Sequence, residues 1–171
     1  MSRIALTSGD VRMAGWRRRY VPIASTIAAC LLTVLPIVVT SPIVPDFAFL
    51  TLIAWRLLRP EMWSASTTLP LGLLNDLLAG HPIGQSMALW TIAFLAFDLL
   101  DSRVLYRDYW MDWFFAALAI LFYAWAGWLI GRFMGSSVAF AVMVPQLGAS
   151  VLAFPLVARI VLALDRWRLS R

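Results

Sequence analysis

The stretch LGLLNDLLAGHPIG, residues 71–84, places an asparagine and an aspartate inside an apolar segment, directly before a corner that contains glycine and proline. Gly80 suits the C-terminus of a helix because glycine can adopt a positive φ angle. Pro82 suits the first turn of the next helix because it has no N–H group to satisfy. With Gly84 closing the corner, the stretch predicts two helices joined by a tight hairpin.

Asp76 lies one turn before Gly80, in surroundings where a carboxylate needs hydrogen-bond or charge partners. The nearest donors are the backbone N–H groups at the start of the following helix, around residues 83–86. We predict that Asp76, helped by Asn75, accepts hydrogen bonds from these groups and so fixes the hairpin. The alternative is a functional role, in which Asp76 binds a ligand, a partner protein or a proton.

The composition is that of an integral membrane protein. Hydrophobic residues make up 62% of the 171 residues, 13% are charged and the mean hydropathy is +0.82, whereas an ordinary soluble domain is about 25% charged. Charge-free runs cover residues 20–45, 113–131 and 133–158, and each approaches or exceeds the roughly 20 residues that a helix needs to cross a bilayer. We therefore expect an all-α bundle of six transmembrane helices, at about residues 20–41, 44–58, 62–79, 83–101, 111–134 and 138–164.

The arginines indicate the orientation of these helices. All fourteen basic residues are arginine, and with six crossings and a cytoplasmic N-terminus only Arg132 lies outside. If the segment 47–58 did not cross, six arginines would lie inside and eight outside, which the positive-inside rule disfavours. We therefore predict a multi-pass protein of the inner membrane with both termini in the cytoplasm. Residues 1–19 form a basic cytoplasmic tail, and residues 20–171 form a single six-helix domain.

Asp98 and Asp101 lie near the inner end of the fourth predicted helix. A proton relay would need a chain of acidic or histidine groups through the bilayer, and the sequence does not provide one. We predict instead that the two aspartates form a solvent-exposed ion-pair cluster with Arg56 or Arg59.

Composition also argues against several classes of function. The net charge of +5 is explained by arginines at helix ends beside anionic headgroups and does not require nucleic acid as a partner. Cys30 and His81 are the only residues of their types, so we expect no internal disulfide and no metal site. The sequence lacks a Gly-x-Ser-x-Gly motif, and its short loops leave no room for a soluble active site. We therefore expect no cofactor, no catalytic residue and no enzymatic activity.

Three glycines follow one another at a spacing of four residues near the end of the fifth predicted helix: Gly127, Gly131 and Gly135. This spacing places them on one face of the helix and allows another backbone to approach closely. The neighbour is either the sixth helix, which carries a small residue at Gly148, or a helix of another protein.

A spaced set of residues resembles the family of the rod shape-determining protein MreD: Pro45, Trp55, Pro60, Gly72, Asp76, Gly80 and Gly84. The chain length, the six predicted helices and the basic C-terminus are also similar to that family. The chain departs from the family pattern at Ala79, where a serine is expected, and at Ser66 and Thr68, where glycines are common. These departures concern the packing of the third helix.

The resemblance implies a non-enzymatic scaffold of the cell-elongation complex that helps to position peptidoglycan synthesis and to maintain cell shape. The implied partners are the bitopic protein MreC and, in the wider complex, the actin-like MreB, the glycosyltransferase RodA and its transpeptidase partner. The resemblance also implies a fold similar to the substrate-binding subunit of energy-coupling-factor transporters. Because one fold can serve several functions, the alternative function is a small-molecule-binding subunit of a membrane transporter.

Overall fold

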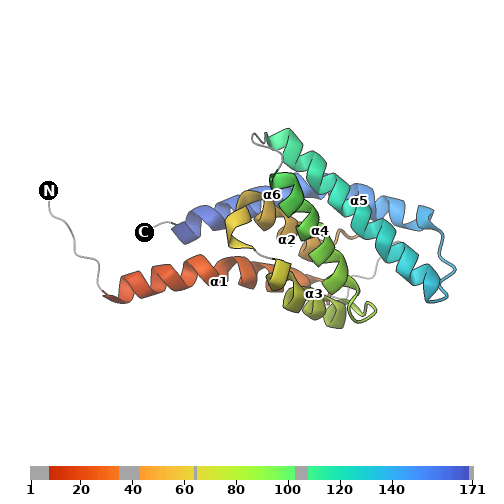
Figure 1. Cartoon of the computed structure of the whole chain (residues 1–171), viewed down its shortest axis with the longest axis horizontal. Coiled ribbons are helices and arrows are strands. Elements are labelled where there is room, and N and C mark those ends of the chain that lie inside the picture. The colour runs from red at the N-terminus through yellow and green to blue at the C-terminus, as the bar shows by residue number, and fades with distance from the viewer. Residues whose placement is uncertain (1–7, 35–42, 64, 103–107, 170–171) are drawn as a thin grey trace.

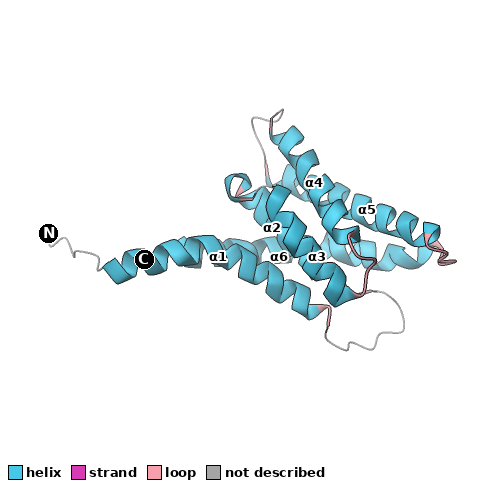
Figure 2. Cartoon of the chain, turned by 60° about the horizontal axis from the view of Figure 1, so that its bottom comes forward, coloured by secondary structure: helices cyan, strands magenta, loops and turns pink. Residues whose placement is uncertain are grey.

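The computed structural model describes residues 8–34, 43–63, 65–102 and 108–169, and within these ranges the chain is helical with no strand (Figure 2). Six α-helices lie in the described residues: α1 (Ser8–Leu32), α2 (Phe47–Leu58), α3 (Ala65–Ala79), α4 (Gln85–Asp101), α5 (Tyr109–Phe133) and α6 (Val144–Leu169). The 3-10 helices η1 (Pro60–Met62) and η2 (Phe140–Met143) precede α3 and α6. Successive α-helices run in alternate directions, and the start of α1 and the end of α6 project from the same end of the molecule (Figure 1). The all-α prediction is confirmed.

Helix α2 forms the centre of the bundle and packs against α1, α5 and α6. All of its residues from 48 to 57 are buried. With twelve residues, α2 is about 18 Å long, well short of the roughly 30 Å of a bilayer's hydrocarbon layer. Because its neighbours cover it on every side, its length need not match the thickness of a membrane.

The outer faces of the bundle are apolar. Exposed leucine and isoleucine side chains recur three or four residues apart along three outer helices: Leu69, Leu73 and Leu77 in α3, Ile92, Leu95 and Leu99 in α4, and Leu152, Leu156 and Ile160 in α6. Exposed apolar surface of this extent is rare on soluble monomers. In the described part of the chain, two helices are long and apolar enough to cross a membrane, Tyr109–Phe133 and Phe140–Leu169. Two further apolar helical segments, Tyr20–Leu32 and Phe47–Leu58, are shorter.

The first and last helices differ most from their predicted ranges. Helix α1 begins at Ser8, so residues 8–19, predicted as part of a tail, are helical. Arginines are good helix formers, and a helix need not end where its apolar residues end. Helix α1 ends at Leu32, and residues 35–41 of the predicted range lie outside the described residues. Helix α6 begins at Val144 with Pro145 in its first turn, a position that proline favours.

Two charge clusters join α2 to its neighbours at one end of the bundle. Arg56, only 2% exposed, forms ion pairs with Asp98 and, at 2.8 Å, with Asp101. The prediction of this partnership is confirmed, but the arginine is buried while the Asp98 side chain is 51% exposed. The pair therefore anchors the end of α4 to the core.

The second cluster joins the end of α2 to the end of α6. Arg59 donates hydrogen bonds to Asp165 from Nε at 3.2 Å and from an Nη atom at 2.9 Å, and these bonds raise the pKa of Arg59. Arg168 donates to the other oxygen of Asp165 at 2.6 Å and lies over the Trp55 ring at 5.3 Å. Charge-assisted bonds of this kind fix the relative positions of two helices.

Candidate functional site

The carboxylate of Asp76 closes the hairpin between α3 and α4. One oxygen accepts a hydrogen bond from the backbone N–H of Ser86 at 2.8 Å, and the other accepts one from Gly84 at 2.9 Å. Asp76 is 1% exposed, so the N–H groups at the positive end of α4, rather than water, hold its charge. The hydrogen bonds predicted for Asp76 are present.

Gly80 ends α3 in a conformation that favours glycine. Its φ angle is +70°, in the left-handed region. The backbone N–H of His81 donates to the carbonyl of Asp76 at 3.1 Å, and this pairing is the Schellman arrangement of a helix C-terminus. The predicted helix end at Gly80 therefore agrees with the structure.

Pro82 lies in a different position from the predicted one. Gly84 has a φ angle of +94° and is the N-cap of α4, so the helix can begin only after it, at Gln85. Pro82 lies before this cap, in a turn in which its carbonyl accepts a hydrogen bond from Gln85 at 3.0 Å. Its fixed φ angle therefore shapes the corner and not the first helical turn.

Asn75 stabilises the hairpin through a hydrogen bond to the Ser86 side chain. The prediction had been that it helps Asp76 to accept hydrogen bonds from backbone N–H groups. Asn75 is fully buried and donates from Nδ2 to the hydroxyl of Ser86 at 3.1 Å. The same hydroxyl lies 3.0 Å from the hydroxyl of Tyr123 and 3.4 Å from Nδ1 of His81. Ser86 therefore connects α3, α4 and α5, a role that no local sequence pattern indicates.

The backbones of α3 and α4 meet at Gly72. A Cβ atom at this position would lie 2.5 Å from Cα and 2.6 Å from N of Met87. Real Cβ atoms essentially never come this close to a backbone, so the approach requires glycine. In the sequence Gly72 is notable only as part of the family pattern, which does not indicate this contact.

The close packing predicted between the α5 glycines and α6 is not found. Among the described residues, a Cβ atom at Gly127 would meet only Nε2 of Gln85, at 3.1 Å, and one at Gly131 would meet only Cβ of Ser136, at 3.8 Å. No described atom lies within 4 Å of such a Cβ at Gly148. A contact between this face and a helix of another protein stays a prediction.

Gly135 lies beyond the end of α5 and has a φ angle of +91°. Its N–H donates to the carbonyl of Arg132 at 3.1 Å, and the N–H of Ser136 donates to that of Gly131 at 2.9 Å. The two bonds form a complete Schellman cap. Gly135 is therefore needed to end the helix, and it does not extend a packing face.

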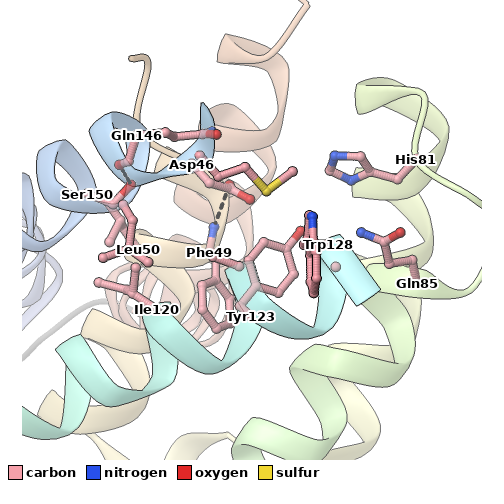
Figure 3. Close-up of a pocket in the computed structure, with 14 residues that line it drawn as sticks. Asp46, Phe49, Leu50, His81, Gln85, Ile120, Tyr123, Trp128, Gln146 and Ser150 are labelled. Atoms are coloured by element: carbon pink, nitrogen blue, oxygen red, sulfur yellow. Dashed lines mark hydrogen bonds between the residues drawn. The ribbon is translucent and has the colours of Figure 1, made fainter. Parts of the chain in front are cut away.

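A cavity of about 260 Å³ adjoins the hairpin (Figure 3). It lies among the N-terminal ends of α2, α4 and α6 and the C-terminal half of α5. Aromatic rings of Phe49, Tyr123 and Trp128 form part of its lining, and the rings of Phe49 and Tyr123 are stacked with centroids 4.4 Å apart. The cavity is at the opposite end of α2 from the arginine clusters.

Polar side chains enter this cavity from three directions. Figure 3 shows Asp46 on one side, with His81 and Gln85, which come from the hairpin, on the other. Asp46 caps α2, because one carboxylate oxygen accepts the N–H of Phe49 at 3.0 Å. Asp46 was not among the predicted site residues, although an aspartate directly before an apolar run is a signal for a helix N-cap.

The polar side chains at this site divide into those that hold the hairpin and those that face the cavity. Within the ranges that the structure describes, no group of three or more histidine, cysteine, aspartate or glutamate side chains could hold a metal ion. The carboxylate of Asp76, Nδ2 of Asn75 and the hydroxyl of Ser86 bond to one another or to the backbone, so they hold the hairpin. Asp46, His81 and Gln85 face the cavity and are placed to contact a bound molecule.

Comparison with known families identifies the chain. The sequence model described as rod shape-determining protein MreD matches residues 19–166. The chain belongs to the MreD family. This family determines rod shape, is associated with the membrane and is not known for enzymatic activity. No curated protein and no solved structure matches the chain, so the similarity to an energy-coupling-factor subunit stays a prediction.

The residues that carry the MreD resemblance have identifiable structural roles. Trp55 is buried in α2 and donates from its indole N–H to the hydroxyl of Ser25 in α1 at 2.8 Å. Pro60 is the first residue of η1. The remaining matched positions are Pro45, next to the α2 cap, and the hairpin residues Gly72, Asp76, Gly80 and Gly84. In this MreD family member the resemblance therefore reflects the centre of the bundle and its hairpin.

Proposed function

We propose that the protein is a non-enzymatic scaffold of the cell-elongation complex in the bacterial inner membrane. In this role it binds MreC and helps to position peptidoglycan synthesis. The family match over residues 19–166 carries the proposal. The apolar outer faces of α3, α4 and α6 support insertion into lipid.

We also propose that all six helices cross the membrane, with both termini in the cytoplasm and the hairpin in the periplasm. The alternating helix directions support this topology because they bring the ends of α2, α4 and α6 to the same side (Figure 1). The clusters around Arg56 and Arg59 lie at that side, as expected for a cytoplasmic face. The short helices α2, α3 and α4 can cross because protein covers α2 and because a bilayer adjusts to modest mismatch.

Cysteine labelling tests the topology. Cys30 is the one native cysteine and is buried, so the background reaction is low. Ile83, 79% exposed, lies in the hairpin, and the exposed Ser102 follows α4. In intact spheroplasts a membrane-impermeant maleimide should label Ile83→Cys, whereas Ser102→Cys should react only after lysis. The reverse pattern, or equal labelling of both, would contradict the topology.

Depletion and co-purification test the scaffold role. Loss of the protein should convert rods to round cells, and pull-down in mild detergent should recover MreC. MreB, RodA and the transpeptidase partner of RodA should follow in the wider complex. Cells that stay rod-shaped and a pull-down without MreC would refute the proposal.

Gly131→Leu tests whether the α5 glycine face contacts MreC. No described backbone of another element lies within 4 Å of a Cβ at this position, so a side chain can begin there without a backbone clash. The variant should keep its thermal stability but lose MreC in the pull-down. Gly148→Leu, at an equally open position of α6, is the matched control and should retain MreC. Retention of MreC by Gly131→Leu would exclude this face as the contact.

The cavity favours one alternative, a small-molecule-binding subunit of a membrane transporter. Its mixed aromatic and polar lining is a feature of ligand sites. Such a subunit would affect the uptake of a nutrient, and its loss would leave cells rod-shaped. Cell shape after depletion therefore separates the two functions.

A further inference from the structure

One wall of the cavity beside the hairpin carries a carboxyl group. Among the described residues that line the cavity, Asp46 is the only acid and none is an arginine. The second aspartate nearby, Asp76, lies behind the lining, with an oxygen 3.9 Å from Nδ1 of His81. A carboxylate at the edge of a low-dielectric space attracts cations and repels anions.

Aromatic and aliphatic side chains form the remainder of the wall. Phe49 and Tyr123 present stacked rings, and Trp128 adds a third. The face of an aromatic ring attracts a cation within about 6 Å. Arg132 lies over the Trp128 ring, 5.9 Å from its centroid, but does not line the cavity. Leucine and isoleucine side chains complete an apolar floor, so the site can also hold an uncharged body.

Two amide side chains remain available inside this space. Gln85 and Gln146 line the cavity (Figure 3), and their amide groups form no hydrogen bond with any described residue. Each amide oxygen can accept a hydrogen bond from an ammonium N–H. They lie on different helices, α4 and α6, so together with Asp46 they surround the space from three sides.

We propose that this cavity binds a small organic ammonium ion that has an apolar body. The ammonium group lies against Asp46, the apolar part lies against the aromatic rings, and the glutamine amides supply polar contacts at the edges of the space. The volume, about 260 Å³, is slightly below the usual range for drug-sized ligands, so one ring with a short aminoalkyl chain fits it best. This binding is separate from the scaffold function, because neither requires the other.

Matched probes test the proposal with the full-length protein in lipid nanodiscs. The probes are 2-phenylethylammonium, the neutral 2-phenylethanol of similar shape and the anion 3-phenylpropionate. Isothermal titration calorimetry should give an affinity for the ammonium that is about tenfold or more above that for the alcohol, as expected for a hydrogen bond to a charged group. The anion should not bind. No binding of the ammonium, equal affinities for ammonium and alcohol, or preferred binding of the anion would overturn the proposal.

Three variants locate the binding. Asp46→Asn keeps an oxygen that can cap α2 but removes the charge, so the preference for the ammonium over the alcohol should disappear. Asp108→Asn changes an exposed N-cap residue of α5 outside the cavity and should bind as the wild type does. Ala124→Leu fills the cavity from α5 and should weaken both probes, a result that stays decisive if Asp46→Asn does not fold. Unchanged ammonium binding by Asp46→Asn or by Ala124→Leu would refute the assignment.

Discussion

Replacement of Gly72 by alanine gives a quantitative test of the hairpin. The added Cβ would lie 2.5 Å from Cα and 2.6 Å from N of Met87, and 2.9 Å from the carbonyl carbon of Ser86. All three atoms belong to the backbone, so no flexible side chain can move aside. Helices α3 and α4 must therefore separate by roughly 1 Å, enough to strain the bonds between Asp76 and the start of α4.

The expected cost follows from two opposing effects. Overpacking of a tight interface costs about 1–3 kcal/mol, and the backbone contact favours the upper end of that range. Alanine in place of a helical glycine returns about 1 kcal/mol through its higher helix propensity. The free energy of unfolding of Gly72→Ala should therefore fall by about 2 kcal/mol.

Gly148→Ala is the matched control for this prediction. It makes the same chemical change inside α6, where a Cβ would meet no described atom within 4 Å, so the protein should gain about 1 kcal/mol. Reversible unfolding in mixed micelles, followed by tryptophan fluorescence, should separate the two variants by about 3 kcal/mol. Equal stability of the two variants would refute the close approach at Gly72.

Three further substitutions test the hairpin and the buried ion pair. Asp76→Ala leaves the N–H groups of Gly84 and Ser86 without their acceptor, so the free energy of unfolding should fall by about 3 kcal/mol or more. Hydrogen exchange at these two amides should accelerate, and unchanged exchange would contradict the assigned bonds. Gly80→Ala forces an L-residue to φ +70° and should cost about 1–2 kcal/mol in the same unfolding assay, where a neutral result would count against the left-handed turn. Arg56→Met removes the cation from two partly exposed aspartates. The free energy of unfolding should fall measurably, but by less than the roughly 3–5 kcal/mol of a fully buried pair. Unaltered stability would show that the pair does not hold α4.

Features that depend on neighbouring residues, or on charge and the direction of the helices, could be predicted from the sequence. The hairpin follows from Gly80, Asp76 and the next helix start, all within a few residues of one another. The pairing of Arg56 with the acidic end of α4 follows from charge and from the alternating helix directions. The start of α1 could not be placed, because apolarity marks the part of a helix that suits lipid and not where helical hydrogen bonding begins.

Features that depend on distant segments were not predictable in the same way. The spacing of Gly127 and Gly131 identifies a helix face but not the element that lies opposite it. Only the folded arrangement shows that the close backbone contact is at Gly72 and that Gly135 caps α5. The cavity also combines residues from α2, the hairpin, α5 and α6, and no single window of the sequence contains them.

The enclosure of α2 by other helices has a consequence for biogenesis. In the proposed topology this helix has only twelve residues and carries Arg56 in its last turn, whereas a helix that crosses a bilayer needs about 20 predominantly apolar residues. During translation α1 is available first as a neighbour, whereas α5 and α6 emerge from the ribosome much later. A nascent chain that ends before α5 should therefore keep α2 at the insertion machinery or let it slip back to the cytosol. The last helices to be synthesised then complete the integration of one of the first.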